Sequence, residues 1–148
     1  MWVEFLHNIF MQVSMDEKEY TAFNSLSLTL ATTFLSIGIS VFTLSIAFID
    51  SKKIDLKHTY DECEKGISLS LSRKINSLSN FIRIMTEIAN LSLWNIVFSF
   101  VTISLSIIFG HMDYNIFVYI ILIPITINIV LTVLSLWKLF RWYHKSHG

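Results

Sequence analysis

Hydroxyl and amide side chains recur at helical spacing inside three long apolar stretches, and they are the residues best placed to do chemistry there. Hydrogen bonds between helices in a membrane contribute roughly 0.6–2 kcal/mol each. The stretches contain no Asp, Glu, Lys or Arg, so neither a proton relay nor an ion-coupled transporter is expected. The polar set comprises Thr32, Ser36, Ser40, Asn95, Ser99, Thr102, Asn128 and Thr132.

Two interpretations of these stripes are open. Lipid-facing positions gain nothing from a hydroxyl, so we expect each stripe to point towards protein or water. The first interpretation is helix packing, because small hydroxylated residues let helices approach closely. The second is a polar path through an oligomer, lined by the same side chains. Asn128 is of greatest interest, because it lies near the centre of the third stretch, four residues after Pro124.

Residues suited to catalysis or metal binding do not form a recognisable constellation. The His, Asp, Cys and Glu within residues 58–64 lack the spacing of a metal site. His144 and His147 are three residues apart, but they end a basic tail, where fraying is expected. With only four Gly, the chain has no Gly-rich phosphate loop. We therefore expect no catalytic residue, no metal and no cofactor.

The apolar stretches define the elements that carry the polar side chains. Residues 25–49, 88–110 and 115–137 can each cross a hydrocarbon core of about 30 Å at 1.5 Å per helical residue. A helix in a soluble core has no reason to stay free of charge for so long. The predicted fold is all-α, a single membrane domain over residues 1–148 with three transmembrane helices. Pro124 is expected to kink the third helix.

The basic residues are sorted by segment, which predicts the orientation. Short loops rich in Lys and Arg stay on the cytoplasmic side. Only Lys18 precedes the first stretch, and residues 111–114 contain no Lys or Arg. We therefore predict a multi-pass protein of the cell (inner) membrane with its N-terminus outside and its C-terminus cytoplasmic. The first 24 residues lack a basic n-region and a cleavage site, so the first span is expected to remain as an anchor. The cytoplasmic set is Lys52, Lys53, Lys57, Lys65, Arg73, Lys74, Arg83, Lys138, Arg141 and Lys145.

Residues 1–14 have the pattern of a short amphipathic helix. Such a helix either lies in the outer membrane interface or packs on the ends of the spanning helices. The sequence favours neither alternative. The apolar stripe consists of Trp2, Phe5, Leu6, Ile9, Phe10 and Val13.

Residues 50–87 form a predicted cytosolic module, and 138–148 a basic cytosolic tail. Apolar residues recur in the module at spacings of four and three, which is a heptad-like seam leading into the second span. One interpretation is a helical hairpin that turns between residues 58 and 68. The other is an amphipathic helix flat on the inner leaflet. The seam, a predicted surface for a partner or for self-association, consists of Leu71, Ile75, Leu78, Ile82 and Met85, and Ala89 continues it.

These features favour a small, non-enzymatic membrane protein whose partners are the lipid bilayer and further copies of itself. Its cytosolic helices would dock a protein partner or relay membrane state, as in a sensor or anchor subunit. The alternative is an oligomeric pore or membrane-permeabilising effector that uses the polar stripes. The layout is similar to that of small bacterial subunits that sense or damage the envelope, although architecture alone does not determine function. Nucleic-acid binding is not expected, because acidic residues nearly cancel the basic ones in residues 50–87.

Cys63 tests the orientation, because it is the only cysteine and lies in the predicted cytosolic module. No disulfide within the chain is possible, and a cytosolic thiol stays reduced. A membrane-impermeant maleimide is expected to label Cys63 only after cells are permeabilised, with the Cys63→Ser variant giving the background. Labelling from outside intact cells would reverse the predicted topology.

Overall fold

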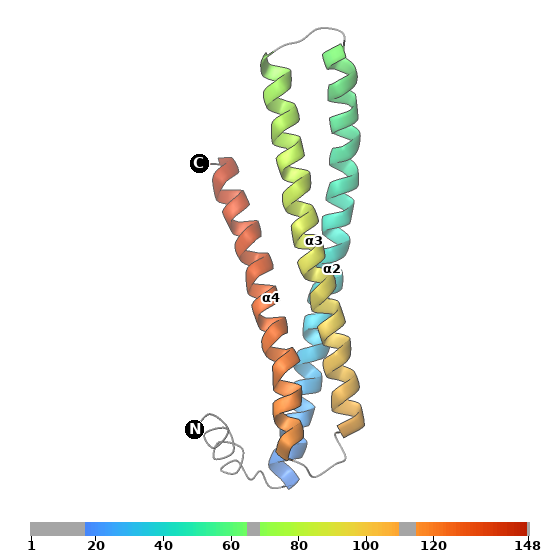
Figure 1. The fold of residues 1–148 in the computed structure, drawn as a ribbon, viewed down its shortest axis with the longest axis vertical. Helices are drawn as coiled ribbons and strands as arrows, with labels where there is room; N and C mark the ends of the chain where they lie inside the picture. Colours follow the sequence, from blue (N-terminus) through green and yellow to red (C-terminus); the bar gives the residue numbers. More distant parts are fainter. Residues whose placement is uncertain (1–16, 65–68, 110–114, 148) are drawn as a thin grey trace, which may run out of the picture. The chain divides into compact units, whose positions relative to one another are not determined.

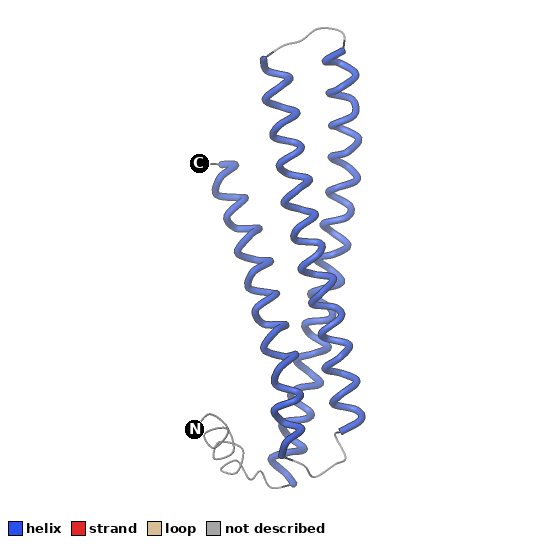
Figure 2. Tube along the Cα trace, viewed as in Figure 1, coloured by secondary structure: helices blue, strands red, loops and turns tan. Residues whose placement is uncertain are grey.

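The computed structural model describes residues 17–64, 69–109 and 115–147, and all of them are helical. The helices are α2 (Glu17–Glu64), α3 (Leu69–Phe109) and α4 (Asn115–His147) (Figures 1 and 2). Each is long and apolar enough to cross a membrane. This confirms the prediction of an all-α chain with three helices of membrane-spanning length. The expected amphipathic helix over residues 1–14 lies outside the described residues.

The helices α2 and α3 extend well beyond their apolar stretches. Their 48 and 41 residues correspond to roughly 72 and 62 Å, about twice the thickness of a hydrocarbon core. α2 begins with Glu17 and Glu19 in its first turn, where acidic side chains interact favourably with the helix dipole. α3 contains neither Pro nor Gly, so nothing in its sequence interrupts the helix between the charged segment and the apolar one.

The chain divides into two compact units. Unit 1 consists of Met1–Ser36 and Asn95–Val130, and unit 2 of Ile37–Trp94 and Leu131–Gly148. Each unit therefore takes part of all three helices, and each has its own packing.

In unit 2, α2 and α3 pack as antiparallel neighbours (Figure 1). The ring of Phe48 meets the ring of Phe81 edge-on at 6.4 Å, and Ile49 packs into a core with Met85 and Ile88. Residues 50–64 and 69–87 thus continue as the two arms of a helical hairpin. Its location in the cytosol stays a prediction.

In unit 1, all three helices are joined through buried contacts. The hydroxyl of Tyr20 donates to the carbonyl of Phe109 at 2.6 Å, which fixes the start of α2 against the end of α3. On α4, the side chains of Val118, Ile121 and Ile125 are buried. Pro124 lies inside α4 without ending it, and the kink expected there stays a prediction.

Two isoleucines of α3 provide a matched test of this packing. Ile88 is 1% exposed and Ile108 is 62% exposed. Ile88→Ala is expected to lower the free energy of unfolding by about 2 kcal/mol or more, because a cavity replaces its contacts. Ile108→Ala should change it by less than about 0.5 kcal/mol. Circular dichroism during SDS titration of protein in dodecyl maltoside measures both, and equal unfolding midpoints would contradict the assignment.

Candidate functional site

A row of polar side chains is buried along α3 in unit 1. Asn95, Ser99, Thr102 and Ser106 are each at most 3% exposed. Their spacings of four, three and four residues place them on one face of the helix. The structure thus places the predicted residues Asn95, Ser99 and Thr102 against protein.

Hydrogen bonds join this row to both neighbouring helices. Asn128 of α4 is fully buried, and its Nδ2 donates to Oγ of Ser99 at 3.3 Å. The Ser99 hydroxyl donates to the carbonyl of Asn95 at 2.8 Å. The Nδ2 of Asn95 in turn donates to the carbonyl of Phe34 on α2 at 3.3 Å. We call this set the Asn95–Ser99–Asn128 network, and it links all three helices in unit 1.

The chemistry available to this network is hydrogen bonding. Its amide and hydroxyl groups do not titrate at physiological pH, so they hold helices in register and carry no charge. A buried amide costs several kcal/mol unless it is hydrogen-bonded, and the bonds that the two Nδ2 groups donate to neighbouring helices offset part of this cost. The network thus has a structural role, which is to hold the three helices together within their apolar stretches.

The predicted stripe on α2 lies on the outside of the chain. Thr32, Ser36 and Ser40 are exposed, whereas Thr132 of α4 is half-buried. The Thr32 hydroxyl donates to the carbonyl of Leu28 and the Ser36 hydroxyl to that of Thr32, both at 3.0 Å. We expected protein or water to face these residues, and within unit 1 none of α3 or α4 covers Thr32 or Ser36.

The face of α2 that packs against the chain consists of small residues, which were not among those predicted from the sequence. Ser27 and Ala31 are buried in unit 1, and Gly38 and Ser45 are buried in unit 2. Small side chains let helices approach closely in a membrane. Their spacings of four and seven residues were the available signal, but the more numerous hydroxyls on the opposite face obscured it.

The predicted seam of residues 50–87 packs in part within the chain. Met85 is buried with Ile49 and Ile88, and Ile82 packs against this core. The positions nearer the turn, Leu71, Ile75 and Leu78, are half-buried. The hairpin therefore covers part of the surface that we expected a partner to cover.

The inward face of α3 changes chemistry where the second apolar stretch begins. Up to Ala89 it consists of apolar residues, and from Ser92 the buried positions are Ser, Asn and Thr. The exposed positions change in the opposite direction, from Ser, Arg, Lys and Asn to residues such as Val97 and Phe100. Water drives apolar side chains inward, whereas lipid does not. This reversal is the pattern of a helix that passes from water into a bilayer.

Two exposed ion pairs of unit 2 lie just outside the apolar stretches. Lys138 of α4 bonds Glu87 of α3 at 2.5 Å, and this bond, with the charges of Lys138 and Arg83, holds the pKa of Glu87 below its ordinary value of 4.5. The hydrogen bond and charge of Lys52, and then the charge of Lys74, similarly lower the pKa of Asp55. Because both values are lowered on folding, the stabilisation is present above the ordinary pKa and is lost as the pH falls through the lowered one.

The chain matches no protein-family model, no curated protein and no solved structure. Among residues 17–64, 69–109 and 115–147, no three His, Cys, Asp or Glu side chains are grouped so that they could hold a metal ion. Because no known protein guides the assignment, a function has to be inferred from features of this chain itself. Three are used below: the Asn95–Ser99–Asn128 network, the exposed stripe of α2 and the hairpin.

The bond between Asn128 and Ser99 predicts a measurable coupling. In a double-mutant cycle, Asn128→Ala and Ser99→Ala should couple by about 0.5–1.5 kcal/mol in the free energy of unfolding. Thr126 is exposed, and its hydroxyl donates a hydrogen bond to the carbonyl of Leu122 on the same helix. A cycle of Asn128→Ala with Thr126→Ala is therefore expected to couple by less than about 0.5 kcal/mol. Additive effects in the first cycle would show that the bond does not join α4 to α3.

Proposed function

We propose that this chain is a non-enzymatic integral membrane protein that self-associates in the bilayer and relays its membrane state to the hairpin of residues 50–87, where a cytosolic protein docks. The observation that carries the proposal is that α2 continues unbroken from its exposed stripe to the hairpin. A movement of α2 in the membrane would thus be transmitted along one continuous helix to the predicted cytosolic module.

Self-association would use the outer face of α2. In unit 1, the buried Ser27 and Ala31 lie on one side of the helix, while Thr29, Thr32 and Ser36 lie on the other and are exposed. A polar, small-residue stripe lets a second helix approach closely, and another copy of the chain would bring the identical stripe to a two-fold contact. The hydroxyls donate hydrogen bonds to backbone carbonyls of their own helix. Their exposure to lipid in a single chain is therefore less costly before a second copy covers them.

Relay would act through the seam of the hairpin. Leu71, Ile75, Leu78 and Ile82 are only half-buried, so part of their apolar surface is still available to a partner. A change in the spacing of α2 and α3 would cover or uncover this surface. A partner responds to such a change only if it binds the two arrangements with different affinity.

A pore is the second candidate, and the exposed hydroxyls of α2 favour it. In a ring of copies, Thr32, Ser36 and Ser40 would line a path of hydrogen-bonding groups suited to water. The stripes of α3 are less suited to this role, because Asn95, Ser99 and Thr102 are buried within one chain.

Two single-cysteine variants in a Cys63→Ser background test the proposal. Ser36→Cys places a thiol on the proposed interface, and Val97→Cys places one on the exposed side of α3, near the depth at which Asn95 meets α2. On oxidation in membranes, Ser36→Cys is expected to form several-fold more disulfide-linked dimer than Val97→Cys. Equal or absent cross-linking at both positions would contradict self-association through α2.

The same variants separate a dry interface from a pore. A dry helix interface keeps a water-soluble methanethiosulfonate reagent away from Cys at position 36, so we expect as little modification there as at position 97. Rapid modification at position 36, with a change in conductance across planar bilayers, would favour the pore instead.

A further inference from the structure

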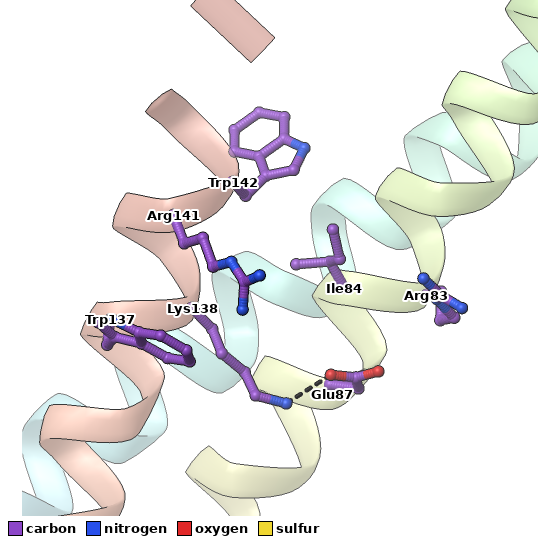
Figure 3. A pocket seen from close by; sticks show the side chains of 7 residues that line it. All are labelled: Arg83, Ile84, Glu87, Trp137, Lys138, Arg141 and Trp142. Carbon is purple, nitrogen blue, oxygen red and sulfur yellow. Dashed lines mark hydrogen bonds and ion pairs between the residues drawn. The ribbon is translucent and has the colours of Figure 1, made fainter. Parts of the chain in front are cut away.

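A pocket of about 360 Å³ lies in unit 2 between α3 and α4 (Figure 3). Its polar and aromatic lining comes from the ends of the two apolar stretches, since Glu87 immediately precedes the second stretch and Trp137 ends the third. Arg83 and Glu87 belong to α3, and Trp137, Lys138, Arg141 and Trp142 belong to α4. Positions at such a boundary are at the depth of lipid headgroups.

The pocket carries an excess of positive charge. Three cations and one anion line it, which leaves a net charge of +2. Glu87 is bonded to Lys138, as the dashed line in Figure 3 marks. One carboxylate does not neutralise three cations, so the pocket keeps a net positive charge although Arg83 also acts on Glu87. Guanidinium groups are well shaped to bind phosphate oxygens through two parallel hydrogen bonds.

Aromatic contacts hold two walls of the pocket in place. The guanidinium of Arg141 lies over the ring of Trp137, 5.3 Å from its centroid, and such a cation–π contact limits the conformations of both side chains. Trp142 packs on Phe81 at 5.0 Å between ring centroids. Trp137, which lines the pocket, is itself 53% exposed. Large apolar surface next to a cationic pocket matches the division of a phospholipid into headgroup and acyl chains.

We propose that this pocket binds the phosphate-bearing headgroup of an anionic phospholipid, with Arg83 and Arg141 supplying the positive charge that attracts the phosphate and the acyl chains covering Trp137. Basic pockets between transmembrane helices on the cytoplasmic side are suited to anionic headgroups. A zwitterionic lipid brings its own cation and leaves the charge of the pocket unbalanced. Free phosphate has the same oxygens but lacks the chains. The site is complete in one chain, so it does not depend on self-association.

Native mass spectrometry of the full chain in dodecyl maltoside tests this site. The titrants are dioleoyl phosphatidylglycerol, dioleoyl phosphatidylcholine and inorganic phosphate. Phosphatidylglycerol is expected to bind about tenfold more tightly than phosphatidylcholine, and equimolar phosphate should not displace it. Arg83→Gln/Arg141→Gln should weaken binding of phosphatidylglycerol about tenfold or more, because each basic residue contributes several-fold near an anionic headgroup. The charge-preserving Arg83→Lys/Arg141→Lys should retain most of it.

The matched control removes the same charge elsewhere in unit 2. Lys57 and Lys74 are exposed and do not line the pocket, so Lys57→Gln/Lys74→Gln should change the affinity less than about twofold. Circular dichroism checks that helicity is retained. If the double arginine variant does not fold, Arg141→Gln alone is expected to lose about threefold. Equal binding by the arginine and lysine variants, equal binding of the two lipids, or displacement by phosphate would each overturn the proposal.

Discussion

Inside a bilayer no hydrophobic force draws one helix to another, because lipid chains are as apolar as leucine. The membrane-depth part of this chain therefore depends on close contact and on hydrogen bonds between helices. The small residues Ser27 and Ala31 on α2 supply the first, and the Asn95–Ser99–Asn128 network supplies the second. Where the first stretch ends and the second begins, the opposite rule applies, and Ile49, Met85 and Ile88 form a conventional hydrophobic core.

Much of the fold could be predicted because charge-free stretches and heptad spacing report directly on lipid and on helix packing. The hairpin turn was expected between residues 58 and 68, and α2 ends at Glu64 while α3 begins at Leu69. The orientation of the α2 stripe could not be predicted. A serine or threonine can satisfy its hydroxyl on its own helix, as Thr32 does, so a polar stripe alone does not say which side packs.

The basic pocket also could not be predicted from the sequence. Glu87 and Lys138 are 51 residues apart, and only the register of α3 against α4 brings them together. Each cation alone is explained by its predicted role in setting topology. What distinguishes Arg83 and Arg141 is that two helices place them around one cavity, with Trp137 and Trp142 as its walls. A single sequence does not contain that juxtaposition.

The length of α2 has an electrostatic consequence. Measured along the helix axis, Glu62 lies about 20 Å beyond residue 49, at 1.5 Å per residue. This is more than twice the screening length of about 8 Å at physiological salt. In the predicted arrangement, with residues 50–87 projecting into the cytosol, Lys52 and Lys53 are close enough to the end of the apolar stretch to experience the surface potential of the lipid, whereas Asp61 and Glu62 are not. The acidic tip would then be insulated from lipid composition, and a molecule that approaches it from solution would meet the charge of the protein alone.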